Sequence, residues 1–142
     1  MGRTLLDTTV VVAALRSGRG ASRVLLTAAL TRRYMILASV PLMLQYESVL
    51  TRPEHLAAAG ITLADVGILL DALAAVVEPI RISYLWRPVL PDPGDDLVLE
   101  TAVNGRADLV VTLNRRHFEP AVASFGLEIL APADAVRRLE NR

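Results

Sequence analysis

Residues 3–15 read RTLLDTTVVVAAL, an apolar run that is interrupted by one carboxylate, Asp7, and resumes behind it. A run of this length predicts a buried strand that ends near Leu6 and passes into a helix beginning at Thr8. Asp7 then falls at the carboxyl end of the strand, which is the edge where open α/β sheets bind ligands. The alternative is that Asp7 only caps the helix, and for Asp7 taken alone the cap is the better interpretation.

The composition predicts one packed domain and excludes several kinds of chemistry. The sequence has 142 residues, 53% of them hydrophobic and 4% aromatic, which is enough for a core without staples. The absence of cysteine excludes disulfides, thiolate zinc sites and cysteine nucleophiles, and two histidines are too few for an all-imidazole metal site. The 15 basic residues are all arginine and balance 15 acids, so no net field indicates nucleic acid and no lysine chemistry is available.

The sequence contains no segment typical of a membrane protein. No window reaches the roughly 18 unbroken apolar residues that span a bilayer. Asp7 also interrupts the N-terminal apolar run before it reaches the length of a signal peptide. We therefore expect a soluble, cytoplasmic protein with no membrane partner.

Predicted strands alternate with predicted helices along the chain. Strands are expected up to Leu6 and over 35–38, 79–82, 108–112 and 127–130, and helices over about 8–15, 21–31, 41–50, 62–77, 95–104 and 132–139. Residues 53–60 are expected to be a break, and residues 84–94 a loop. This alternation predicts an α/β fold with a mostly parallel five-stranded sheet that is covered by helices on both faces.

Three acids in the second half of the chain occupy one predicted helix. Apolar residues follow Asp95 at three, four and seven positions, so the helical phase places Asp95 on the buried stripe. A helix cap and a metal ligand are equally good interpretations of Asp95, because unpaired amides and the helix dipole stabilise carboxylates at helix starts. Asp96 and Glu100 share a neighbouring face, where we expect solvated or accessory groups.

Glu47 lies on the helix predicted over 41–50, in the same row as Met43 and inside the apolar stripe. A carboxylate there must be paired or bind a metal, because burying it bare costs several kcal/mol. The alternative is an ion pair with an arginine such as Arg52 or Arg81.

Asp7, Glu47 and Asp95 are therefore expected to converge at the carboxyl edge of the sheet. A carboxylate cage without cysteine or a histidine cluster suits Mg²⁺ or Mn²⁺. Such an ion would activate water and stabilise the transition state of phosphodiester hydrolysis.

Four parts of the sequence have a characteristic order and spacing: residues 5–10 (LLDTTV), Glu47, residues 92–102 (DPGDDLVLETA) and residues 107–118 (ADLVVTLNRRHF). Together they resemble the PIN-domain family, close to its branch of VapC-like toxins. The resemblance covers essentially the whole chain, 1–142. It implies a three-layer α/β/α fold, a metal-dependent ribonuclease, often a homodimer, and often a toxin that a cognate antitoxin neutralises.

The resemblance implies that Asp7, Glu47 and Asp95 are the first, second and third metal-binding acids of the family. Asn114 replaces the fourth acid in a Thr-Leu-Asn form and offers a carbonyl oxygen without charge, which makes a second ion less expected. Four further residues are expected to assist at this site: Thr9, Thr112, Asp92 and Asp96.

Several arginines follow elements whose ends should face the acidic edge, where they could hold RNA phosphates without reading sequence: Arg16, Arg19, Arg23, Arg115 and Arg116. The alternative for each is an ordinary solvated arginine. His117 is expected to pack or lie at the surface, and His55 to be exposed. Tyr84 and Trp86 could stack on a base or cover a dimer interface.

Two functions of different classes remain open at this point. The leading hypothesis is an Mg²⁺- or Mn²⁺-dependent endoribonuclease, in which Asp7, Glu47 and Asp95 hold the metal and Asn114 and Thr9 complete its shell. The alternative is a catalytically degenerate PIN fold that binds RNA or an antitoxin without turnover.

Overall fold

In the computed structural model, which describes residues 1–83 and 93–141, five short strands form the centre of the molecule. They are β1 (Thr4–Leu6), β2 (Leu37–Ala38), β3 (Glu78–Pro79), β4 (Leu109–Val111) and β5 (Glu128–Leu130). β4 pairs with β1 and β5, β2 pairs with β3, and a bridge between Thr4 and Ile36 joins the two groups, all in parallel. The predicted parallel five-stranded sheet is therefore confirmed, with the order β3-β2-β1-β4-β5.

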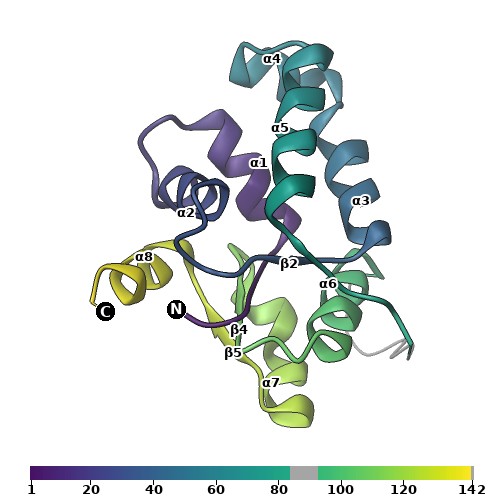
Figure 1. The fold of residues 1–142 in the computed structure, drawn as a ribbon, viewed down its shortest axis with the longest axis vertical. Helices are drawn as coiled ribbons and strands as arrows, with labels where there is room; N and C mark the ends of the chain where they lie inside the picture. Colours follow the sequence, from purple (N-terminus) through teal and green to yellow (C-terminus); the bar gives the residue numbers. More distant parts are fainter. Residues whose placement is uncertain (84–92, 142) are drawn as a thin grey trace.

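Helices cover both faces of this sheet. They are α1 (Thr8–Arg16), α2 (Ala21–Leu30), α3 (Val40–Leu50), α4 (Pro53–Ala59), α5 (Leu63–Val76), α6 (Pro93–Asn104), the short 3₁₀ helix η1 (Arg115–Phe118), α7 (Glu119–Phe125) and α8 (Pro132–Glu140). In Figure 1, α1 and α2 lie on one side of the strands and α6 and α7 on the other, while α4 and α5 extend away from the sheet. This is the predicted α/β/α arrangement.

The core fixes the position of α3 relative to the end of β1. Every residue of β1 and β4 is buried, as expected for parallel strands covered on both faces. The fully buried Tyr46 of α3 donates a hydrogen bond from its hydroxyl to the carbonyl oxygen of Leu6. Burial, reinforced by the nearby charge of Asp7, raises the pKa of Tyr46 above its ordinary value, so the hydroxyl remains a donor.

Polar contacts and one close approach fix α6. The hydroxyl of Ser39 caps α3 by accepting a hydrogen bond from the amide of Leu42, at 3.2 Å, and lies 2.7 Å from the hydroxyl of Thr101 in α6. Gly105 follows α6 directly, and a Cβ at this position would lie 2.9 Å from the side chain of Ile80 and 3.0 Å from the carbonyl oxygen of Thr101. A larger residue at this junction would therefore force Ile80 or the backbone of Thr101 to shift.

Three local features differ from the prediction. The segment expected to be a break is the helix α4, because Pro53 occupies its first turn, where proline is favoured, and Gly60 ends it in the left-handed conformation with φ 68°. The structure also has η1 and α7 between β4 and β5, where no helix was predicted. The third strand lies at 78–79 instead of 79–82.

Three residues of the sequence predictions, Tyr84, Trp86 and Asp92, lie outside the described residues. Among the helices that are described, no single one is long and apolar enough to cross a membrane. Within the described residues, α4 and α5 pass the test of length and composition only when they are taken together, with a bend of 89° between them.

Candidate active site

Asp7 occupies the turn between β1 and α1 and is only 2% exposed. It holds the N-cap position of α1 with an extended backbone, but its side chain makes no capping hydrogen bond. Its Oδ2 instead accepts hydrogen bonds from the hydroxyls of Thr9, at 2.6 Å, and Thr112, at 2.8 Å. The interpretation of Asp7 as a simple helix cap is therefore wrong.

The same two hydroxyls fix the loop that follows β4. Thr112 Oγ1 accepts a hydrogen bond from the amide of Asn114 at 2.9 Å, and Thr9 Oγ1 accepts one from the amide of Leu113 at 3.4 Å. Each threonine thus joins Asp7 to the loop. As a result, the loop that carries Asn114 is held near Asp7 at the carboxyl edge of the sheet.

A cleft of about 660 Å³ opens over this edge and is lined by Asp7, Asp95 and Asn114. Asp95 is 7% exposed and is the third residue of α6, so it does not occupy the N-cap position. The structure therefore brings together three of the four predicted catalytic residues.

His117 contacts Asp95, which differs from the packing or surface role predicted for it. Its Nδ1 lies 2.9 Å from Asp95 Oδ2. The 3₁₀ helix η1 positions the ring, because Phe118 is fully buried and the amide of His117 donates to the carbonyl oxygen of Asn114 at 3.0 Å. Asp95 thus has a partner from a different part of the chain.

Asp96 and Glu100 are almost completely buried, at 2% and 1% exposure, so the expectation of solvated groups is wrong. Both make interactions within the protein, and neither lines the cleft.

Within 1–83 and 93–141, no group of three or more histidine, aspartate or glutamate side chains is arranged to hold a metal ion.

Glu47 does not face the core, and the prediction that it lies on the buried stripe of α3 is wrong. Its side chain is exposed and lines a separate groove of about 400 Å³ between α3 and α5, together with Asp71. The helical phase was ambiguous because α3 is apolar on several faces. Val40 and Leu44, for example, are 71% and 59% exposed.

Gln45 takes the place in the cleft that was predicted for Glu47. Its Oε1 accepts a hydrogen bond of 2.6 Å from the hydroxyl of Thr8. The spacing of Gln45, Val49 and Arg52, which all line the cleft, is that of one helical face and was available in the sequence. The neutral side chain of Gln45 gave no reason to select this face.

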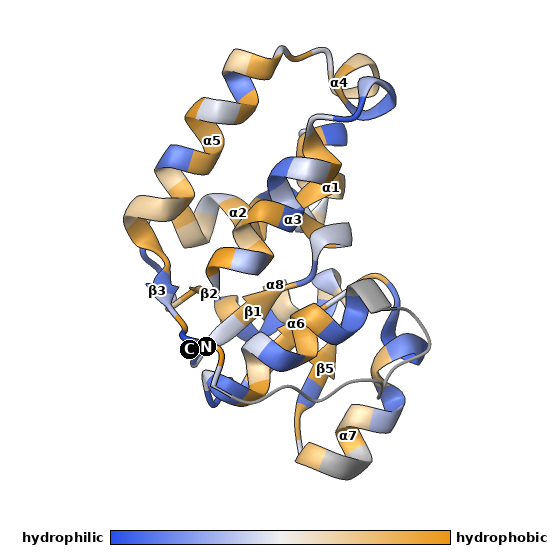
Figure 2. Ribbon diagram, turned by 90° about the vertical axis from the view of Figure 1, so that its right-hand side faces the viewer, coloured by the Kyte–Doolittle hydropathy of each residue, from blue (hydrophilic) through white to orange (hydrophobic). Residues whose placement is uncertain are grey.

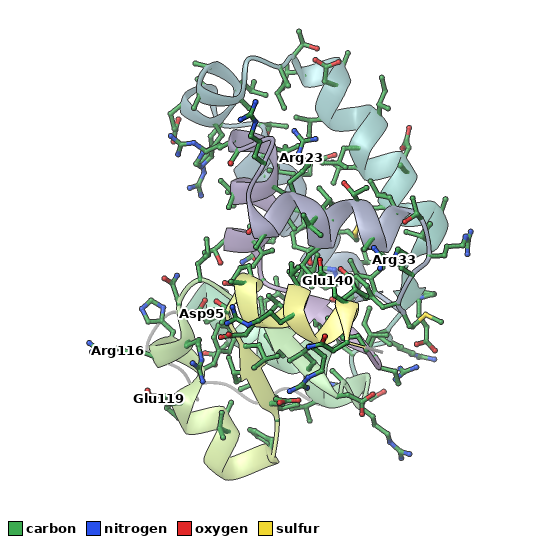
Figure 3. The ribbon with its side chains drawn as sticks, turned by 90° about the vertical axis from the view of Figure 1, so that its left-hand side faces the viewer. Arg23, Arg33, Asp95, Arg116, Glu119 and Glu140 are labelled. Atoms are coloured by element: carbon green, nitrogen blue, oxygen red, sulfur yellow. The ribbon has the colours of Figure 1, made fainter. Side chains whose placement is uncertain are left out.

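The arginines predicted to bind RNA fall into three groups. Arg16 lines the cleft, and Arg115 and Arg116 line an adjoining pocket that also includes Asn114 and His117. In Figure 3, Arg116 extends outward from the edge of the molecule where Asp95 lies. Two of the predicted arginines line neither pocket: Arg19 and Arg23.

Two further residues of the cleft were not predicted as functional. Arg52, which follows α3, and His55, in α4, both line it. His55 is half-buried, so the expectation that it would simply be exposed is wrong.

Comparison with known proteins identifies the family of the chain. The sequence profile of the PIN domain matches residues 3–116. The chain belongs to the PIN-domain family. No curated protein matches the sequence.

A crystal structure of VapBC2 from Rickettsia felis, bound to a DNA fragment from its promoter, has the same fold as this PIN domain. The TM-score is 0.62, and the match covers 91% of this chain and 98% of the other. The two sequences are 14% identical, so the similarity concerns the fold alone.

PIN domains generally use divalent metal ions, and the donor atoms of this cleft fit such an ion. Asp7 and Asp95 provide carboxylates, and Asn114 and Gln45 provide amide oxygens, without sulfur ligands. Mg²⁺ typically binds through one or two protein carboxylates and completes its shell with water and substrate phosphates. The cleft therefore offers two carboxylates to a divalent ion, and not the three carboxylates that were predicted.

Proposed function

We propose that this PIN domain is an Mg²⁺- or Mn²⁺-dependent endoribonuclease with Asp7 and Asp95 as its metal ligands. The observation that supports this most strongly is the pair of buried carboxylates in one cleft at the carboxyl edge of the sheet. Buried charges are retained where they are paired or bind a metal.

Each carboxylate is held in place by other side chains of the protein. Thr9 and Thr112 fix the orientation of Asp7, and His117 contacts Asp95. A bound divalent ion would stabilise the negative charge that develops in phosphodiester hydrolysis. Because the ligands are already oriented, little reorganisation is needed when the ion and the RNA bind.

The neutral side chains of Gln45 and Asn114 favour one ion over two. Both line the cleft, but neither adds negative charge beside Asp7 and Asp95. We therefore expect one metal ion that is held weakly until the phosphate of the substrate contributes an oxygen.

The proposal is tested by Mn²⁺-dependent cleavage of a structured RNA. We expect Asp7→Asn to lower the rate by more than the 10- to 100-fold that is typical when a group supporting a metal ligand is removed. Glu47→Gln is the matched control, because Glu47 lines a different groove, and should cleave at the wild-type rate. Equal rates for wild type and Asp7→Asn, or cleavage that EDTA does not reduce, would sink the proposal.

A second candidate function is a binding module without turnover, and the neutral Gln45 and Asn114 are the observation that favours it. Such a protein would bind RNA or an antitoxin but would show no metal-dependent cleavage. Mn²⁺-dependent cleavage of RNA that is abolished in Asp95→Asn would count against this alternative.

We further propose that the protein is the toxin of a toxin–antitoxin pair and forms a homodimer. The fold similarity to VapBC2 supports the proposal of a toxin.

The proposal of a homodimer is supported by the apolar groove between α3 and α5, where Val40 and Leu44 are exposed. In Figure 2, most of α5 is orange or tan, the colours of hydrophobic residues, with hydrophilic positions between them. Exposed apolar surfaces of this kind typically bind a protein partner. The expected cytoplasmic location stays a prediction.

A further inference from the structure

The cleft over Asp7 has a second end, which is lined by basic groups. The axis of α1 leads from Thr8, next to Asp7, to Arg16, a rise of about 12 Å. Arg52 follows α3, and His55 belongs to α4, which contacts both α1 and α3. The carboxylates and the arginines therefore lie at opposite ends of the same cleft.

The protein itself does not use these basic groups. Arg16 and Arg52 are exposed, and neither forms an ion pair with any part of the chain that the structure describes. The Nδ1 atom of His55 is buried without a hydrogen-bond partner among the described residues. Elsewhere in the molecule, Arg3, Arg137 and Arg138 each pair with a carboxylate. Arg16 and Arg52 are therefore available to bind an anion in the cleft.

We propose that Arg16, Arg52 and His55 form a phosphate-binding subsite, here called the arginine subsite, for the backbone of the RNA substrate. Guanidinium groups match phosphate oxygens in geometry and charge. The placement of the scissile bond at Asp7 and Asp95 rests on the proposed function. About 12 Å from Asp7, the arginine subsite holds a phosphate a few nucleotides away from that bond.

The apolar walls between the two ends of the cleft indicate contact with the RNA backbone, without recognition of the bases. Val12 and Ala13 of α1 and Val49 of α3 line this part of the cleft and offer no side-chain hydrogen bonds. Sequence is read by hydrogen bonds to base edges, whereas arginine contacts to phosphates position the strand. The arginine subsite therefore contributes affinity and register, with little preference for sequence.

A polyanion fits the whole cleft better than an acidic peptide does. Repeated phosphates can meet the metal ligands at one end and the arginines at the other. Arg115 and Arg116, which line the adjoining pocket, continue the basic surface on the far side of Asn114. The carboxylates thus lie between two basic segments, as expected for a strand that crosses the site. A peptide carboxylate would match the arginines alone.

The arginine subsite is tested by fluorescence anisotropy with a labelled single-stranded oligoribonucleotide in EDTA, over a range of KCl concentrations. We expect Arg16→Gln/Arg52→Gln to bind more weakly and to reduce the slope of log K against log salt by about 0.7 for each phosphate that the variant no longer neutralises. Arg81→Gln/Arg106→Gln is the control, because it removes the same charge from two exposed arginines that line neither the cleft nor the adjoining pocket and form no ion pair within the described residues. Its slope should remain that of the wild type.

A rescue variant separates charge from folding. Arg16→Lys/Arg52→Lys restores both charges and should bring the slope most of the way back to the wild-type value, and thermal unfolding of each variant verifies that it is folded. Equal slopes for the two glutamine double variants would overturn the arginine subsite. So would a wild-type protein that binds poly-glutamate but not RNA, since the arginines would then serve a protein partner.

The binding assay tests the arginine subsite independently of the proposed function, because the assay contains no metal. Asp7→Asn should bind the oligoribonucleotide no more weakly than the wild type in EDTA. If Asp7→Asn cleaved as fast as the wild type in Mn²⁺, the proposed function would fail and the salt-slope result would still stand.

Discussion

Asp7 uses only one of its two carboxylate oxygens within the protein. Oδ2 accepts both threonine hydroxyls, and Oδ1 has no hydrogen bond from any residue of the described chain. A buried carboxylate with a remaining acceptor in a cleft is well suited to a cation, which explains why a charged group is retained beside Leu6 and Tyr46 in the core. The geometry of Asp7 therefore supports a ligand role where its sequence position alone favoured a cap.

Gln45, one of the neutral residues of the cleft, provides the sharpest single-residue prediction. Gln45→Glu adds a third carboxylate beside Asp7 and Asp95, where the hydroxyl of Thr8 can still donate to it. We expect the affinity for Mn²⁺ to rise by about tenfold or more, because the metal gains a charged ligand. Calorimetric titration with Mn²⁺ measures this.

Glu47→Gln is the control for that titration and should leave the Mn²⁺ affinity unchanged. A fall in affinity in Glu47→Gln, with no rise in Gln45→Glu, would show that the assignment of the two positions is reversed.

Thr112 is predicted to matter for stability as well as for the site. It is fully buried, and Thr112→Val keeps its shape while removing the donor to Asp7 and the acceptor for the amide of Asn114. We expect a decrease of about 1–3 kcal/mol in the free energy of unfolding, because buried polar groups are left unpaired. Urea denaturation checks this, and a change below about 0.5 kcal/mol would mean that the hydrogen bonds are not formed.

The helix α3 shows why sequence predicted part of the site and not the rest. Asp7 was identified because it interrupts one apolar run, and Asp95 because apolar residues follow it at three, four and seven positions. The exposed Val40 and Leu44 make the pattern of α3 nearly uniform, so its phase did not distinguish Glu47 from Gln45. The face of α3 that lines the cleft is selected by tertiary contacts, such as the hydrogen bond between Thr8 and Gln45. Contacts of this kind cannot be predicted from periodicity.

The helix α4 shows a second limit, which concerns proline. Pro53 was interpreted as a break, but proline at the first position of a helix costs no hydrogen bond. The error had a functional consequence, because α4 carries His55 into the cleft. Parallel pairing, by contrast, follows from the alternation of strands and helices, which the chain displays clearly, whereas the order of the strands was not predicted.

The junction between α6 and β4 is expected to be intolerant of a side chain. Gly105→Ala would bring a Cβ within 2.9 Å of the side chain of Ile80 and 3.0 Å of the carbonyl oxygen of Thr101. We expect a destabilisation of about 1–3 kcal/mol by overpacking, measured by chemical denaturation. Adding Ile80→Val to Gly105→Ala removes one of the crowded atoms and should restore part of the stability. An unchanged stability in Gly105→Ala alone would contradict the close approach.

The whole molecule presents two different surfaces, a cleft over the carboxyl edge that contains carboxylates and arginines, and an apolar groove between α3 and α5. In the functions proposed above, the cleft binds RNA and the groove binds a protein. This division predicts that the two surfaces can be altered separately.

The proposed homodimer is tested by Leu44→Glu, which places a charge on the exposed apolar face of α3. We expect the molar mass from light scattering to change from dimer to monomer, because burying an unpaired carboxylate opposes association. The control is Val24→Glu, on α2, which should leave the mass unchanged. A wild-type protein that is monomeric at all concentrations would contradict the dimer.

The location of the metal ion tests the central claim most directly. We would soak crystals of the wild type and of Asp7→Asn in Mn²⁺ and calculate anomalous difference maps near the manganese absorption edge. The account predicts a peak between the carboxylates of Asp7 and Asp95 in the wild type, and none at this place in Asp7→Asn. A peak beside Glu47 and Asp71, or a wild-type cleft without a peak, would contradict it.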